Sequence, residues 1–237
     1  MHAALGEPVR LAIVDELVLS DRAPSDLARR LGLASNLLAH HLDVLDRVGL
    51  IERVVSAGDR RRRYVRLRRG EAFDVVTGVT GATGAPASPR RRRTHAHALF
   101  VCTHNSARSQ IAAALWTVRT GERASSAGTR PADRVHPGAV AAAARAGLDL
   151  SGARPRALEA ADLDADLVVT VCDLAREALD TPDGWLHWSM PDPAEAGTRR
   201  SFDDTVVRLD QRIAALAPVV GTPALAHDHP DDTERQP

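Results

Sequence analysis

A cysteine, an arginine and a serine lie close together in the stretch Cys102-Thr103-His104-Asn105-Ser106-Ala107-Arg108-Ser109. The apolar run ALFVC that ends at Cys102 is typical of a buried strand, and the residues from Ser106 onward are typical of a helix. A loop between a strand and a helix presents successive backbone N–H groups and a helix N-terminus, both of which bind anions. A thiol placed there ionises easily and attacks the centre of a tetrahedral oxyanion. The pattern therefore predicts an oxyanion-handling thiol site with Cys102 as the nucleophile.

The other residue types in this loop fit the same chemistry. The planar guanidinium of Arg108 is suited to hold two oxyanion oxygens at once. Ser109 is placed to hydrogen-bond the Cys102 sulfur, and Asn105 tolerates the left-handed backbone that a tight anion loop requires. A cysteine at a strand end is more often a packing residue, but the strand end, the helix start and the Arg-Ser pair together favour a site. The expected oxyanion-binding residues are Thr103, His104, Asn105, Ser106, Ala107 and Arg108.

Strands and helices alternate from residue 98 onward, which predicts a four-stranded parallel α/β domain. The β-prone runs are residues 98–102, 124–128, 165–173 and 184–190. The helical runs are residues 106–120, 135–148, 174–179 and 202–217. We place this domain at residues 98–220 and expect a disordered tail at residues 221–237, which is polar and rich in proline.

The segment CTHNSARS after ALFV resembles the active-site loop of the low-molecular-weight tyrosine phosphatase and arsenate reductase superfamily. Four later segments, Ser126–Thr129, Gly147–Leu158, Asp166–Asp173 and His187–Ala194, resemble the corresponding parts of that family. The resemblance implies that Asp192, in Pro191-Asp192-Pro193, is the general acid. The acid that protonates the leaving oxygen has to lie opposite the nucleophile. A carboxyl group held on a loop between two prolines is suited to that position.

Phosphatase and arsenate reductase activity both use Cys102, Arg108 and Asp192. Three details are similar to the reductases: the loop continues Arg-Ser-Gln, Ala-Glu follows Asp192-Pro193, and Cys172 stands where reductases carry a second cysteine. No third cysteine follows, so the three-thiol relay of thioredoxin-coupled reductases cannot run within this chain. We expect no bound cofactor and an external thiol reductant: mycothiol with mycoredoxin, glutathione with glutaredoxin, or a thioredoxin system. Cys172 is either a resolving thiol or a buried strand residue.

The N-terminal part has the element order of a winged helix-turn-helix. Helical patterns cover residues 7–20, 25–32 and 35–49, and two β-prone runs flank Ala57-Gly58-Asp59. The segment LARRLGLASNLLAHHLDVLDRVGLIERV resembles ArsR-type repressors, which implies a homodimer, formed through this domain, on double-stranded operator DNA. The resemblance implies that the base-facing residues are Ser35, Asn36, Ala39 and His40. The residues expected at the tip of the wing are Arg60, Arg61, Arg62 and Arg63, which would contact phosphate or the minor groove.

Composition supports the division into two parts. Residues 1–95 hold 17 arginines and 11 acidic residues, whereas the remainder is acidic, which suggests that the first part faces nucleic acid. We expect a DNA-binding domain at residues 1–76 and a flexible linker at residues 77–97 that tethers the domains loosely. With two cysteines, no signal peptide and no long apolar run, we expect a cytoplasmic protein without a membrane span. The adjacent histidines His40 and His41 point to different faces of their predicted helix, so no metal site is expected.

Three overall functions follow from these features. The first is an arsenate reductase joined to a transcriptional regulator of ArsR type. The second is a tyrosine phosphatase joined to such a regulator. The third is a transcription factor whose second domain only senses an oxyanion. The combination of Cys102, Arg108 and Asp192 favours turnover, because a pure sensor does not need a general acid.

Overall fold

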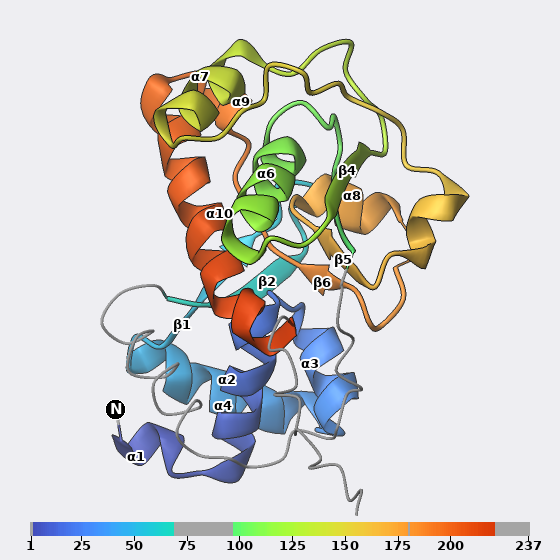
Figure 1. Cartoon of the computed structure of the whole chain (residues 1–237). Helices are drawn as coiled ribbons and strands as arrows, with labels where there is room; N and C mark the ends of the chain where they lie inside the picture. The colour runs from blue at the N-terminus through green and yellow to red at the C-terminus, as the bar shows by residue number, and fades with distance from the viewer. Residues whose placement is uncertain (1, 69–96, 180, 221–237) are drawn as a thin grey trace, which may run out of the picture.

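The computed structural model describes residues 2–68, 97–179 and 181–220. Nearly all of the expected linker at 77–97 and the expected tail at 221–237 lie outside these residues. The described part forms two domains, the first below and the second above in Figure 1.

The N-terminal domain consists of helices followed by a hairpin, as the sequence predicts. Its helices are α1 (His2–Leu5), α2 (Pro8–Leu19), α3 (Pro24–Leu31) and α4 (Ser35–Arg47). Proline at the first position of α2 and of α3 suits a helix start, and Gly32 ends α3 in a left-handed conformation with φ of 64°. A core of leucine, isoleucine and valine side chains holds these helices against the hairpin.

The hairpin pairs β1 (Ile51–Val55) with β2 (Arg63–Leu67) in an antiparallel register that joins Ile51 to Leu67 and Val55 to Arg63. Residues 56–62 connect the two strands. We call this connection the wing tip. The structure thus confirms the expected helix, helix, helix, hairpin order of a winged helix-turn-helix.

The C-terminal domain is a parallel sheet covered by helices. Its strands are β3 (Ala98–Cys102), β4 (Ala124–Gly128), β5 (Leu167–Thr170) and β6 (Leu186–His187), in the order β4-β3-β5-β6. Its helical elements are α6 (Arg108–Thr120), α7 (Pro137–Arg145), η1 (Ala160–Asp164), α8 (Asp173–Ala178), α9 (Pro193–Ala196) and α10 (Arg199–Val220). This confirms the predicted four-stranded parallel architecture. The short elements η1 and α9 were not predicted, because neither is long enough to show a helical period.

Helix α10 links the two domains in space. It packs along α6 and α7 of its own domain and extends to α2 of the N-terminal domain (Figure 1). Helix α8 packs instead on β3 and β5, the two central strands. Residues at the carboxyl ends of these strands are therefore framed by α6 and α8.

The two domains are joined by buried polar contacts, contrary to the loose tethering that the linker suggested. Asp21 is fully buried and forms an ion pair with Arg212 of α10. Its second carboxylate oxygen accepts a hydrogen bond of 2.8 Å from the Ser189 amide, and its own amide donates to the His187 carbonyl at 2.7 Å. The indole N–H of Trp188 donates to the Leu19 carbonyl at 2.9 Å. Linker composition carries no information about which polar groups of two domains meet.

Within the ranges given above, none of the helices combines the length and the apolar character needed to cross a membrane.

Candidate active site

The sulfur of Cys102 lies at the carboxyl end of the fully buried strand β3, where the chain turns toward α6. The Asn105 amide donates to this sulfur at 3.2 Å, and the Ser109 hydroxyl lies 3.1 Å from it. Cys102 has an exposed fraction of 2%. The thiol is thus held between a loop amide and a hydroxyl of the first turn of α6, as the residue pattern predicted for Ser109.

Asn105 organises the loop around the thiol. Its φ of 48° makes it the single left-handed non-glycine residue in the described part of the chain. Its side-chain amide donates to the hydroxyls of Ser109 and Ser126, each at 2.8 Å. Its side-chain oxygen accepts from the Arg156 amide at 2.9 Å and from the Gln110 side chain at 3.2 Å. A left-handed backbone costs free energy, and these four bonds hold the residue in it.

The carbonyl groups of the loop are tied to the segment that follows β4. The carbonyls of Cys102, Thr103, His104 and Ser106 accept hydrogen bonds from amides between residues 129 and 136, at 2.8–3.1 Å. Their acceptor oxygens are therefore engaged away from the thiol, which is what a backbone anion cradle requires. Gly128 permits this close approach, because a Cβ there would lie 2.8 Å from the Thr103 carbonyl oxygen.

The guanidinium of Arg108 is directed to the segment around Asp192. Nη1 donates to the Met190 carbonyl at 3.0 Å, and Nη2 donates to the Asp192 carboxylate at 2.6 Å. Arg108 is buried, and the other carboxylate oxygen of Asp192 caps α9 by accepting from the Ala194 amide at 3.0 Å. The structure therefore brings the expected cation and the expected acid into one ion pair.

Cys172 is placed beside the loop of Cys102. Val101 pairs with Thr170 in the sheet, so Cys102, the last residue of β3, and Cys172, two residues after the end of β5, lie at the carboxyl ends of neighbouring strands. The Cys172 thiol lies 3.3 Å from the Thr103 hydroxyl and accepts from the Ala175 amide at 3.4 Å as the N-cap of α8. Burial raises the pKa of the Cys172 thiol, and the positive charge of Arg108 opposes this shift. Both cysteines are free thiols.

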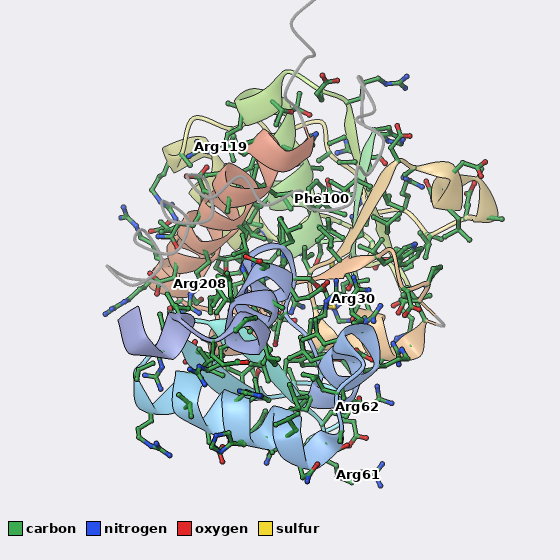
Figure 2. All side chains as sticks on the ribbon, turned by 90° about the horizontal axis from the view of Figure 1, so that it is seen from below. Arg30, Arg61, Arg62, Phe100, Arg119 and Arg208 are labelled. Atoms are coloured by element: carbon green, nitrogen blue, oxygen red, sulfur yellow. The ribbon has the colours of Figure 1, made fainter. Side chains whose placement is uncertain are left out.

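The expected DNA-facing residues lie on the surface of the N-terminal domain. Ser35, Asn36, Ala39 and His40 are all exposed on the first turns of α4, whereas His41 is buried. The four arginines of residues 60–63 are exposed as well. Figure 2 shows the side chains of Arg61 and Arg62 at the edge of the molecule. Their exposed placement fits contact with DNA.

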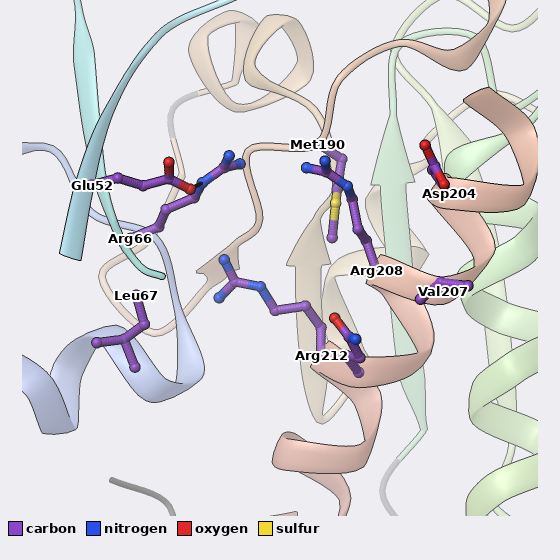
Figure 3. A pocket seen from close by; sticks show the side chains of 9 residues that line it. Glu52, Arg66, Leu67, Met190, Asp204, Val207, Arg208 and Arg212 are labelled. Atoms are coloured by element: carbon purple, nitrogen blue, oxygen red, sulfur yellow. Dashed lines mark hydrogen bonds and ion pairs between the residues drawn. The ribbon is translucent and has the colours of Figure 1, made fainter. Parts of the chain in front are cut away.

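A cavity of about 440 Å³ lies between the hairpin of the N-terminal domain and α10. Arg66 enters it from β2, and Arg208 and Arg212 enter it from α10 (Figure 3). Met190 also lines this cavity, and its carbonyl accepts the hydrogen bond from Arg108. Met190 therefore connects the segment that carries Asp192 to the interdomain cavity as well as to Arg108.

The sequence pattern alone does not indicate several residues of the site. Ser126, Gln110 and the amide of Arg156 complete the network around Asn105. The segment Ser126–Thr129 stands out in the sequence only by its family resemblance, although its serine and glycine are a signal of a close approach to the loop. Nothing in the sequence indicates that Arg156 would contribute a backbone amide.

Comparisons with known proteins identify the families of the two domains. Residues 97–228 match the family model described as low molecular weight phosphotyrosine protein phosphatase, and residues 5–54 match a model described as a helix-turn-helix domain. An arsenate reductase of Brevibacillus brevis is 37% identical over 101 residues, which cover 40% of this chain and 75% of that protein.

Two solved structures are also similar. A low molecular weight protein tyrosine phosphatase from T. tengcongensis is 24% identical, with a TM-score of 0.49, and the match covers 52% of this chain and 99% of that one. An arsenate reductase from Archaeoglobus fulgidus is 30% identical, with a TM-score of 0.41, and the match covers 49% of this chain and 98% of that one.

Proposed function

Because this chain belongs to the low molecular weight phosphotyrosine protein phosphatase family and carries a helix-turn-helix domain before that fold, we propose that it is an arsenate reductase joined to a DNA-binding regulator of ArsR type. The placement of Cys102 carries the enzymatic part of this proposal. Its sulfur accepts a hydrogen bond from the Asn105 amide and faces Ser109 at the start of α6, with the Arg108–Asp192 pair completing the set.

Each residue has a specific part in the proposed reaction. The Cys102 thiolate attacks the arsenic atom of arsenate, whose oxygens are held by the loop amides and by Arg108. Asp192 gives a proton to the oxygen that leaves as water. A second thiol then attacks the Cys102 sulfur, a disulfide forms, and the arsenic leaves as arsenite with the two electrons of the broken sulfur–arsenic bond. Ser109 stabilises the Cys102 thiolate before the attack and again when an external thiol reduces the disulfide and releases it.

Cys172 favours reduction over phosphate ester hydrolysis. Phosphatase turnover ends when water attacks the cysteinyl intermediate and needs no second thiol. Here a second free thiol lies beside the loop, 3.3 Å from the Thr103 hydroxyl. The 37% identity to an arsenate reductase supports the same choice. The electrons come finally from an external thiol, since no third cysteine is present in the chain.

The regulatory part of the proposal rests on the exposed surface of the N-terminal domain. The first turns of α4 supply base contacts through Ser35, Asn36, Ala39 and His40, and the arginines of residues 60–63 bind phosphate. The domain acts as a homodimer on two DNA half-sites. Replacing Arg60, Arg61, Arg62 and Arg63 by alanine is expected to weaken binding to the promoter duplex upstream of the gene and to reduce its salt dependence.

An activity assay with two substrates tests the enzymatic proposal. Arsenate reduction would be followed with mycothiol, glutathione and thioredoxin systems in parallel, and hydrolysis of para-nitrophenyl phosphate would be followed with the same enzyme. We expect arsenate turnover with one of the thiol systems and its loss in Cys102→Ser. Fast ester hydrolysis without arsenate reduction would identify a phosphatase. Neither activity, with arsenate-dependent DNA binding, would identify a sensor.

A further inference from the structure

Two carboxylates of α8 hold the wing tip of the DNA-binding domain. Asp173 and Glu177 lie one helical turn apart and face the same way. Asp173 accepts a hydrogen bond of 2.8 Å from the Ala57 amide. Glu177 accepts from the Asp59 amide and from the Ser56 hydroxyl, each at 2.7 Å. Hydrogen bonds to a charged acceptor are the strong ones, so this contact fixes the conformation of residues 56–59.

The fit between α8 and the wing tip is close. A Cβ atom at Gly58 would overlap the carboxylate oxygen of Glu177 that binds Asp59. The Tyr64 hydroxyl lies 3.2 Å from the other oxygen of Glu177, and its ring lies 4.5 Å from the ring of His187. His187 in turn lies 3.1 Å from Asp173 in a buried pair. Such a set of complementary contacts is specific and is not a chance meeting of two surfaces.

The contact leaves the arginines of the wing tip free to face outward. Ser56 and Tyr64 are buried on the side of α8, whereas the side chains of Arg61 and Arg62 are 91% and 58% exposed. Helix α8 therefore supports the buried side of the wing tip, and the arginines of the wing tip face solvent. A binding element that is ordered before it meets its ligand binds more tightly than a disordered one.

The same helix begins at the second thiol of the site. Cys172 is the N-cap residue of α8, where its sulfur accepts from the Ala175 amide. It also contacts Thr103, the residue after Cys102. Any covalent change at the Cys172 sulfur removes this cap from the helix turn that carries Asp173. The thiol chemistry and the wing tip are thus connected through six residues of one helix.

We propose that α8 makes DNA affinity depend on the thiol state of Cys172. With Cys172 reduced, α8 holds the wing tip and operator affinity is high. When Cys172 forms a disulfide with Cys102, the first turn of α8 loosens, Asp173 and Glu177 leave the wing tip, and affinity falls. The assignment of arsenate as the natural oxidant rests on the function proposed above. The two thiols lose two electrons and two protons, As(V) becomes As(III), and one arsenate oxygen leaves as water with those protons.

Substitutions in the contact test the support of the wing tip without any arsenic chemistry. Glu177→Gln weakens the acceptor and Gly58→Ala blocks the approach, while Asp210→Asn, in an exposed pair with Arg119, is the matched control. We expect faster amide deuterium exchange in residues 56–62 for both variants, and about tenfold weaker binding to the promoter duplex if one wing in ten remains ordered. Exchange and affinity equal to those of the control would overturn the proposal.

Two oxidants separate this proposal from the enzymatic one. Diamide converts two thiols into a disulfide without arsenate, and mass spectrometry of the peptides identifies the bond. We expect diamide and arsenate each to speed exchange in residues 56–62 and to weaken DNA binding in the parent protein, and neither to do so in Cys172→Ala. An effect of diamide alone would uphold the coupling and refute arsenate as its oxidant. A Cys102–Cys172 disulfide that leaves exchange in the wing tip unchanged would refute the coupling.

Discussion

The carboxylate of Asp192 accepts a 2.6 Å hydrogen bond from the guanidinium of Arg108, a residue 84 positions earlier in the chain. This pair joins the start of α6 to the start of α9, and the Met190 carbonyl holds the other terminal nitrogen of the guanidinium. The acid is thus fixed by the same cation that is proposed to hold the substrate. In the proposed reaction, an oxyanion that takes the donors of Arg108 releases this carboxylate, which takes up a proton from the bound acid anion and then gives it to the leaving oxygen.

Asp192→Asn tests the role of this carboxyl group. The amide oxygen of asparagine still accepts from Arg108, but asparagine cannot donate the proton of a carboxylic acid. We expect kcat for arsenate reduction to fall by about 100-fold or more with a small change in KM. Glu195→Gln, an exposed position on the same short helix, is the control and should retain full turnover. Equal turnover in the two variants would show that Asp192 is not the acid.

Asn105→Ala tests whether the loop depends on the asparagine side chain. The change removes hydrogen bonds to Ser109, Ser126, Gln110 and the Arg156 amide and leaves a left-handed alanine. We expect the free energy of unfolding to fall by about 1–3 kcal/mol. Misplacement of the loop should lower kcat/KM for arsenate by about 100-fold. Urea denaturation and steady-state kinetics measure both, with Asn36→Ala on α4 as the control. A stable, fully active variant would contradict the role given to this network.

Much of the fold followed from local patterns in the sequence. The apolar run ending at Cys102 and the alternation of strands and helices sufficed to predict the parallel sheet, because buried strands and amphipathic helices carry their own periods. Gly32 marked the end of α3, while its start at Pro24 lies one residue before the predicted one. The loop residues from Cys102 to Ser109 could be predicted as a site because they are contiguous in the chain.

Contacts between distant segments were not predictable in the same way. The pairing of Arg108 with Asp192 and the hold of Glu177 on the wing tip depend on how elements dock. A carboxylate on a short helix such as α8 looks like any solvated residue until its partner is known. The expectation of loose tethering failed for this reason, because Asp21 and Arg212 are unremarkable in sequence and buried together in the structure.

Asp21→Ala tests the energetic role of the domain contact. The substitution leaves the guanidinium of Arg212, which is 5% exposed, without its carboxylate and removes the acceptor of the Ser189 amide. Breaking a buried pair from one side costs about 3–5 kcal/mol of unfolding free energy. Asp203→Ala removes a half-exposed partner of Arg145 and should cost less than about 1 kcal/mol. Urea denaturation measures the free energy of unfolding of both variants. Equal losses of this free energy would contradict the conclusion that the interdomain pair stabilises the fold.

The pH dependence of Cys172 reactivity separates an internal relay from an external one. Burial raises the pKa of this thiol, and the nearby Cys102 thiol raises it further against the opposing charge of Arg108. Because only the thiolate attacks, internal resolution is slow near neutral pH and accelerates as the pH rises through that raised pKa. We therefore expect the rate at which arsenate forms the Cys102–Cys172 disulfide in single-turnover experiments to increase steadily above pH 8, the region near the ordinary cysteine pKa of about 8.5.

In Cys172→Ala no such disulfide can form, and arsenate turnover at neutral pH with excess external thiol should be retained. Loss of that turnover would make Cys172 an obligatory resolving thiol at every pH, and a disulfide rate independent of pH would show that the buried thiol is not the attacking group.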